Sequence, residues 1–140
     1  EVLRSIEARI VDLDLAENFR MLGRIPYADL VCLLTNAIAL LNPSRFEGWS
    51  TTIEEAKAFG VNMVLSDLPV HHEQVGENAI FFDAHDAHSL ADALRNSQNA
   101  FGNSRPTPDT LRDRSYSRVQ LFATDFAELV KTTIAEASAK

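Results

Sequence analysis

Three short apolar runs, each separated from the next by a helix-forming segment, constrain the fold of this chain most strongly. The runs cover residues 37–41, 62–66 and 79–82. An apolar run without alternation is typical of a parallel strand that is covered on both faces. Strands that alternate with helices predict an α/β fold with a doubly wound parallel sheet and right-handed crossovers.

Other segments extend this pattern. Residues 18–22 form a further strand candidate, so four strands are expected, fewer than the five or six that such a Rossmann-like sheet usually contains. Helices are expected where apolar residues recur at helical spacing or where a helix-starting residue precedes helix formers. These segments are 1–14, 27–36, 54–59, 70–76, 86–101 and 111–138, the last with a break near Ser115. Residues 102–108 (GNSRPTP) form the one expected linker.

Length and composition indicate a single globular domain, residues 1–140. The 140 residues are 46% hydrophobic and 24% charged, which is enough to bury a core. Because the first residue is Glu1 and not Met, the numbering is expected to begin inside a longer polypeptide, with strands lost upstream. The net charge of −7 argues against a nucleic-acid partner, since phosphate backbones need a basic face.

The single cysteine excludes a disulfide framework. Cys32 lies in the apolar run 30–34, so a buried, inert thiol in a reducing cytoplasm is expected. The longest apolar window, residues 30–41, falls short of the roughly 20 residues that span a bilayer. A cytoplasmic protein without a signal peptide is therefore predicted.

The stretch 42–60 (NPSRFEGWSTTIEEAKAFG) is the predicted centre of function. A strand ends at Asn42, a polar loop carries Glu47, helix-starting residues follow from Ser50, and Gly60 ends the helix. In an open α/β sheet such a junction is where ligands bind. The main-chain N–H groups of residues 49–52 suit a phosphate, and the carboxylates of Glu47 and Glu55 can face the same crevice, where a carboxylate suits ribose hydroxyls.

A purely structural interpretation of the same residues stays open at this point. Thr51 with Glu54, and Thr52 with Glu55, both fit a capping box, in which the glutamate only satisfies main-chain donors.

Several motifs in order along the chain resemble retaining glycosyltransferases of family 4, which have the two-domain GT-B architecture. The stretch 43–60 contains the E-x7-E spacing, from Glu47 to Glu55. The resemblance extends to FRMLGRIP (19–26), SDLPVH (66–71), and GENA (76–79) with Phe82 and Asp83, so it covers roughly residues 1–95.

The resemblance implies a donor-binding domain that moves a sugar from a nucleoside diphosphate to an acceptor with retention of configuration. Glu47 would sit by the donor sugar and Glu55 would accept the ribose hydroxyls. Main-chain N–H groups of Gly48, Trp49, Ser50 and Thr51 would approach the diphosphate and sugar, and Arg24 and Ile25 would lie near the base. No cofactor or obligatory metal is implied beyond the nucleotide-sugar donor. For the whole enzyme the resemblance implies a part in polysaccharide biosynthesis. It also allows a peripheral association of the full-length enzyme with a membrane.

Departures from the family concern three positions and two missing segments. The family usually has Gly at Ser50, Pro at Asn62 and often Arg at His72. Its diphosphate-binding Arg and Lys and its acceptor domain lie outside these 140 residues. The isolated chain is therefore expected to fold without turning over substrate, and the sugar, base and acceptor stay undetermined.

Other residues have competing interpretations. The histidine and acidic clusters at 71–73 and 83–88 could ligate zinc, but solvated helix caps are favoured for His85 and His88, and either a surface position or ligand contact for His71. Trp49 is expected to pack the loop more than to stack on a ligand.

Two other functional classes compete with sugar transfer: a glycoside hydrolase, and a non-enzymatic nucleotide-binding module that includes receiver-like modules. Glu47 and Glu55 could serve a glycoside hydrolase as acid and nucleophile. A non-enzymatic nucleotide-binding module is a further alternative. A receiver-like signalling module would use Asp12 or Asp14, but both are predicted at the end of a helix, where a receiver needs a strand end.

Overall fold

A computed structural model describes residues 2–76, 78–101 and 108–138. The chain forms two compact units, residues 1–31 and residues 32–140. Each unit is described by itself below, and the parallel sheet belongs to the second.

The first unit begins with the predicted amphipathic helix, α1 (Val2–Asp12). The strand predicted at residues 18–22 is wrong: this segment is the end of a turn followed by irregular chain, and it joins no sheet of the described residues. Its apolar side chains are exposed, with Phe19 at 53% and Leu22 at 54%. A strand requires a hydrogen-bonding partner from elsewhere in the chain, and local sequence does not reveal whether one is present.

The next helix, α2 (Tyr27–Asn36), has the predicted bounds. Leu34 is its buried residue, at 6% exposure. Cys32 is exposed, so the predicted buried thiol is wrong. Two residues along a helix are separated by roughly 200° around its axis, and a helix that turns Leu34 inward turns Cys32 outward.

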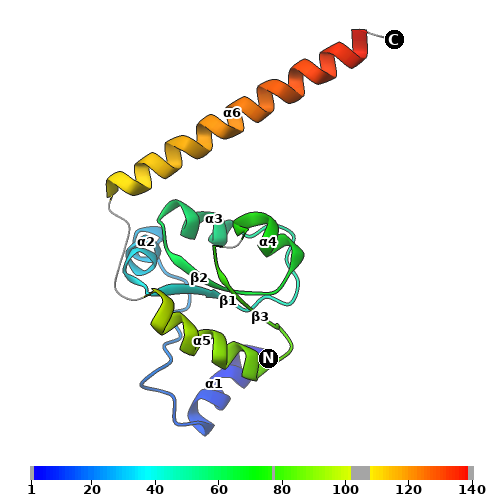
Figure 1. Ribbon diagram of the computed structural model, residues 1–140. Helices are drawn as coiled ribbons and strands as arrows, with labels where there is room; N and C mark the ends of the chain where they lie inside the picture. The colour runs from blue at the N-terminus through cyan, green and yellow to red at the C-terminus, as the bar shows by residue number, and fades with distance from the viewer. Residues whose placement is uncertain (1, 77, 102–107, 139–140) are drawn as a thin grey trace. The chain divides into compact units, whose positions relative to one another are not determined.

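The sheet of the second unit has three parallel strands in the order β1-β2-β3 (Figure 1). They are β1 (Ala39–Asn42), β2 (Asn62–Ser66) and β3 (Ile80–Phe82). Ala39 pairs with Asn62, and Val64 pairs with Ile80. The central strand is the most buried, as the uninterrupted apolar runs predict for a sheet covered on both faces.

Helices cover both faces of the sheet. Figure 1 shows α3 (Thr51–Ala58) and α4 (Pro69–Val75) over one face and α5 (Ala87–Phe101) over the other. On the α5 side, Val64, Phe82 and Ala93 form a buried cluster. On the α3 side, Ile53 is completely buried. The strand order and these layers confirm the predicted α/β class.

Helix α3 ends as its terminal glycine predicts. Gly60 has a φ of 65°, which an L side chain rarely adopts. The N–H of Val61 donates to the carbonyl of Ala56 at 2.8 Å, and the N–H of Gly60 donates to that of Lys57 at 3.2 Å. This pair of bonds is a Schellman motif, which turns the chain from α3 directly into β2.

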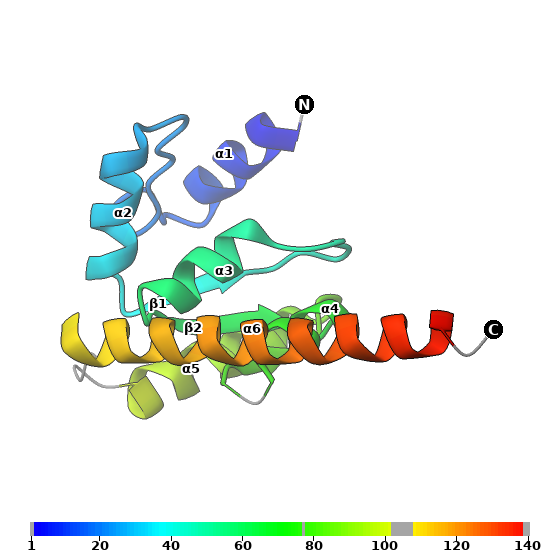
Figure 2. The same cartoon turned by 90° about the horizontal axis from the view of Figure 1, so that it is seen from above.

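The last helix, α6 (Pro108–Ser138), is continuous, as Figure 2 shows along its length. The break predicted near Ser115 is absent because residues 109–138 contain no glycine or proline to interrupt the helix. Residues 102–107 of the predicted linker lie outside the described residues. No helix in the described ranges combines the length and apolar character needed to cross a membrane.

Candidate functional site

The candidate site starts at the carboxyl end of β1. Oδ1 of Asn42 accepts a hydrogen bond from the main-chain N–H of Ser44 at 3.1 Å, which starts the loop. Nδ2 of Asn42 donates to Oε2 of Glu47 at 3.0 Å and contacts the hydroxyl of Ser50 at 3.4 Å. A single side chain therefore fixes both the turn that begins the loop and the carboxylate in its middle.

Glu47 is partly exposed, and its carboxylate accepts hydrogen bonds from several side chains. Its side chain is 24% exposed, and Oε2 lies 3.2 Å from Nε2 of His71. Burial acts to raise the pKa of the Glu47 carboxyl, but hydrogen bonds from His71, Asn42, Ser50 and Ser44 lower that pKa below its ordinary value. Glu47 is thus held as a carboxylate at the carboxyl edge of the sheet.

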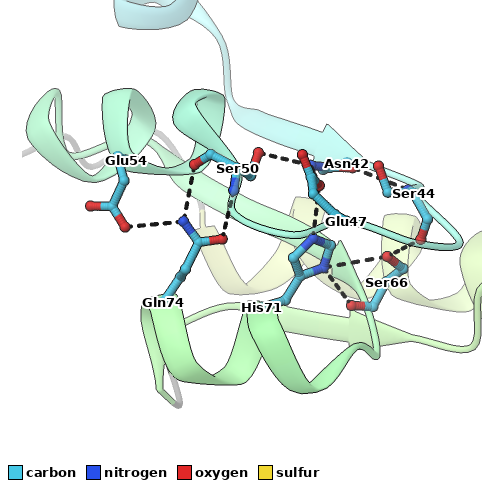
Figure 3. A network of polar contacts seen from close by, with 8 residues as sticks. All are labelled: Asn42, Ser44, Glu47, Ser50, Glu54, Ser66, His71 and Gln74. Atoms are coloured by element: carbon cyan, nitrogen blue, oxygen red, sulfur yellow. Dashed lines mark hydrogen bonds and ion pairs between the residues drawn. The ribbon is translucent and has the colours of Figure 1, made fainter.

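His71 belongs to α4 and has no exposed surface. Nδ1 of its ring lies 2.8 Å from the main-chain carbonyl of Ser66 and 3.3 Å from the Ser66 hydroxyl. Nε2 faces Glu47 on the other side of the ring (Figure 3). The imidazole connects the end of β2 to the loop that follows β1.

Gln74, one turn further along α4, holds the residue that precedes α3. Its side chain is 5% exposed. Oε1 of Gln74 accepts from the N–H of Ser50 at 3.2 Å, and Nε2 donates to the carbonyl of Ser50 at 3.0 Å and to Oε1 of Glu54 at 3.1 Å (Figure 3). Both main-chain groups of Ser50 are therefore bonded to one side chain.

The start of α3 retains main-chain donors. Ser50 is the N-cap and makes no side-chain capping hydrogen bond, and the first intrahelical bond runs from the N–H of Glu54 to the carbonyl of Ser50. The N–H groups of Thr51, Thr52 and Ile53 precede that bond and have no partner among the described residues. With the positive end of the helix dipole, they can bind an anion.

The capping-box interpretation does not hold for Glu54, whose carboxylate contacts Lys57 at 3.0 Å and Gln74. Glu55 is half-buried, and its side chain makes no hydrogen bond or ion pair to any residue that the structure describes. A half-buried carboxylate without a protein partner can accept hydrogen bonds from ligand hydroxyls.

The predicted site residues divide into two groups. Those from Glu47 to Glu55 form one continuous loop and helix start, as expected, although the N–H of Ser50 already bonds Gln74. Trp49 is 54% exposed, so its surface is partly covered by the chain, and the packing of its ring against the loop stays a prediction. Arg24 and Ile25 lie in the first unit, where they line a hollow of about 560 Å³ with Pro26, Tyr27 and Leu30.

The structural roles of two residues were not predicted from the sequence. His71 is fully buried, where a surface position or ligand contact was expected, and Gln74 was not considered. A signal was present: His71, Gln74 and Val75 follow the i, i+3, i+4 spacing of a buried helix face. Two polar residues on such a face require hydrogen-bonding partners.

The remaining histidines and aspartates have local roles. The N–H of His85 donates to Asp83, and that of His88 donates to Asp86, as the predicted helix caps require. His72 pairs with Asp67 at 2.7 Å. Among the described residues there is no group of three potential metal ligands.

The second unit is thus an α/β domain with an open parallel sheet, and in this class of fold ligands bind at the carboxyl edge of the strands. Comparison with known proteins gives the family. Residues 1–99 match the family described as "Glycosyl transferases group 1", and the chain belongs to it.

The chain is also similar to individual proteins. It is 32% identical over 92 residues to the O-antigen chain mannosyltransferase RfbU of Salmonella typhimurium. This alignment covers 66% of this chain and 26% of that protein. It resembles the structure of sucrose-phosphate synthase from Thermosynechococcus elongatus with a TM-score of 0.61 and 20% identity, over 86% of this chain and 34% of that one. This likeness confirms the GT-B type of fold, and the chain spans about a quarter to a third of the length of these relatives.

Proposed function

We propose that this chain is the donor-binding domain of a retaining glycosyltransferase of family 4, which transfers a sugar from a nucleoside diphosphate to an acceptor. The observation that carries the proposal is the start of α3. Three main-chain donors without described partners lie there, and carboxylates precede and follow them in the chain, at Glu47 and Glu55. Donors suit the diphosphate, and carboxylates suit hydroxyl groups.

The roles follow from the chemistry of each group. The N–H groups of Thr51, Thr52 and Ile53, with the helix dipole, stabilise the negative charge that grows on the leaving diphosphate. Glu55 accepts hydrogen bonds from the ribose, and Glu47 contacts the donor sugar. Gly48 and Trp49 border the sugar, with the exposed ring of Trp49 available for stacking.

The remaining parts of the reaction belong to the whole enzyme. Arg24 and Ile25 are proposed for contact with the base, and the acceptor binds to a second domain. Similarity to an O-antigen chain mannosyltransferase supports a part in building a polysaccharide. Diphosphate charge is neutralised by basic residues and main-chain donors, with no bound metal required.

A thermal-shift series tests the proposal. Nucleoside diphosphates with different bases should raise the melting temperature, and free oligosaccharides should not, which also separates the donor site from a glycoside hydrolase site. A ligand at about 100 times its Kd adds about 2.7 kcal/mol to the free energy of unfolding. Glu55→Ala should remove the shift, while Glu136→Ala, at an exposed position of α6, should leave it intact. Absence of any diphosphate-dependent shift at millimolar concentration would overturn the proposal.

A further inference from the structure

The fully buried ring of His71 makes polar contacts through both of its nitrogens, which a residue that only fills space would not need. On one side it meets the hydroxyl and the carbonyl of Ser66, and on the other it meets the Glu47 carboxylate. These neighbours come from β2 and from the loop after β1 (Figure 3). Which atoms carry protons can be worked out from the acceptors and donors alone.

Nδ1 of His71 must carry a proton. The Ser66 hydroxyl has a single hydrogen, which it donates to the carbonyl of Ser44 at 2.5 Å. It can therefore only accept from Nδ1, as can the carbonyl of Ser66 at 2.8 Å. Both groups on this side of the ring require a donor at Nδ1.

A second proton lies between His71 and Glu47. Nε2 of His71 is 3.2 Å from Oε2 of Glu47, and the same oxygen accepts from Nδ2 of Asn42. If the ring were protonated only at Nδ1, the lone pair of Nε2 would face a carboxylate oxygen. Both atoms would then be acceptors, and no hydrogen bond could form between them. Because Oε2 of Glu47 already accepts from Asn42, the carboxyl is the partner that lacks the proton. The ring holds the proton.

We propose that His71 is a positioning residue of the donor site: protonated on both ring nitrogens, it fixes the Glu47 carboxylate in the orientation that receives the donor sugar. This inference rests on the proposed function, because it assigns Glu47 to the sugar. It adds a residue of α4 to a site built otherwise from the loop after β1 and from α3. The stretch SDLPVH (66–71) contains His71, but it does not by itself predict the contact with Glu47.

The role is specific to the sugar because a separate contact holds the diphosphate part of the site. Gln74 binds both main-chain groups of Ser50 and so positions the start of α3 without His71. The nearby ionisable residues His72 and Asp67 pair with each other at 2.7 Å. Glu47 is thus the one charged group in the described residues that contacts the His71 ring.

Nitrogen NMR of the histidine-labelled chain tests the protonation directly. At pH 7, both ring nitrogens of His71 should give shifts of the protonated type, with the signal assigned by its loss in His71→Asn. Glu47→Gln should convert the Nε2 signal towards the unprotonated type, because the carboxylate that stabilises the charge of the ring is gone. An unprotonated Nε2 in the wild-type chain would overturn the proposal without any ligand present.

Calorimetric binding tests the positioning role. The ratio of the affinity for a nucleoside diphosphate sugar to that for the corresponding nucleoside diphosphate gives the gain in affinity due to the sugar. His71→Asn retains a donor near Ser66 but is too short to reach Glu47, and should reduce that gain about tenfold, the value of one hydrogen bond to a charged group. His71→Gln, whose amide nitrogen reaches the position of Nε2, should restore part of it. His72→Gln, at the neighbouring half-exposed position, should bind as wild type.

The outcomes separate the two proposals. A wild-type chain that binds no nucleoside diphosphate contradicts the proposed function. Normal diphosphate binding with an unchanged sugar gain in His71→Asn overturns the role of His71 and leaves the proposed function standing. Equal losses in His71→Asn and His71→Gln, with both variants folded, would show a packing role and overturn positioning.

Discussion

The side chain of Gln74 bonds to both main-chain groups of Ser50, accepting from its N–H at 3.2 Å and donating to its carbonyl at 3.0 Å. This pair of bonds links α4 to the start of α3 across 24 residues of chain. The amide of Gln74 thus bonds both the N–H and the C=O of a buried residue, as a neighbouring strand would do in a sheet. The orientation of the candidate anion site thus depends on a residue outside the loop that forms it.

Gln74→Ala should therefore lower the free energy of unfolding by about 1–3 kcal/mol, because it leaves the buried main-chain N–H of Ser50 without a hydrogen-bond acceptor. Urea unfolding followed by circular dichroism measures the change. Gln98→Ala, on the exposed surface of α5, is the matched control and should stay within about 0.5 kcal/mol of wild type. Equal stability of the two variants would show that the Ser50 contacts contribute nothing.

Truncation of Ile53 tests the packing of α3 on the sheet. Ile53 is 0% exposed, so Ile53→Ala should cost about 2–5 kcal/mol of unfolding free energy through lost burial and the cavity left behind. Ile38→Ala, at a position 57% exposed, should cost little. Thermal or urea unfolding of both variants gives the comparison, and a small loss for Ile53→Ala would contradict the buried position of α3.

Gly60 and Gly48 differ in what a methyl group would do. Gly60 has a φ of 65°, so Gly60→Ala should destabilise the fold by about 1–2 kcal/mol. At Gly48 an added Cβ meets no atom within 4 Å, and Gly48→Ala should leave unfolding unchanged within about 0.5 kcal/mol. Denaturant melts of the two variants should separate clearly. A neutral Gly60→Ala would argue against the Schellman ending of α3.

Glu47 should make stability depend on pH in acid. Its pKa is lower in the folded chain than its ordinary value, so its contribution to stability is fully present above the unfolded pKa of about 4.3. That contribution is lost as the pH falls through the lowered folded value. Wild type should therefore lose more stability than Glu47→Gln between about pH 5 and pH 3, measured by urea unfolding. Parallel pH curves for the two proteins would show that the folded carboxyl is unperturbed.

The order of elements could be predicted from sequence because its signals are local. Apolar runs and their breakers gave β2 (Asn62–Ser66) and α2 (Tyr27–Asn36) with their observed bounds. Gly60 similarly identified the end of α3, since a terminal glycine has a local conformational role. The loop and helix start of the candidate site were predicted for the same reason.

The missed strand pairing and the two missed site residues depend on residues distant in sequence. Residues 18–22 have strand-like composition, but pairing depends on a partner strand. His71 contacts Glu47, and Gln74 contacts Ser50, in both pairs across 24 residues. Such contacts arise only when α4 packs beside α3 and the loop that follows β1. The polar, inward-facing spacing on α4 signals that partners exist without identifying them.

The central claim is that the start of α3 binds the diphosphate of a nucleotide sugar. Its most direct test is a titration of the nitrogen-15-labelled chain with a nucleoside diphosphate, followed in the amide spectrum. We expect the amides of Thr51, Thr52 and Ile53 to shift most, because their N–H groups precede the first helical hydrogen bond. Saturable shifts confined to other parts of the chain, or no shifts at millimolar ligand, would contradict it.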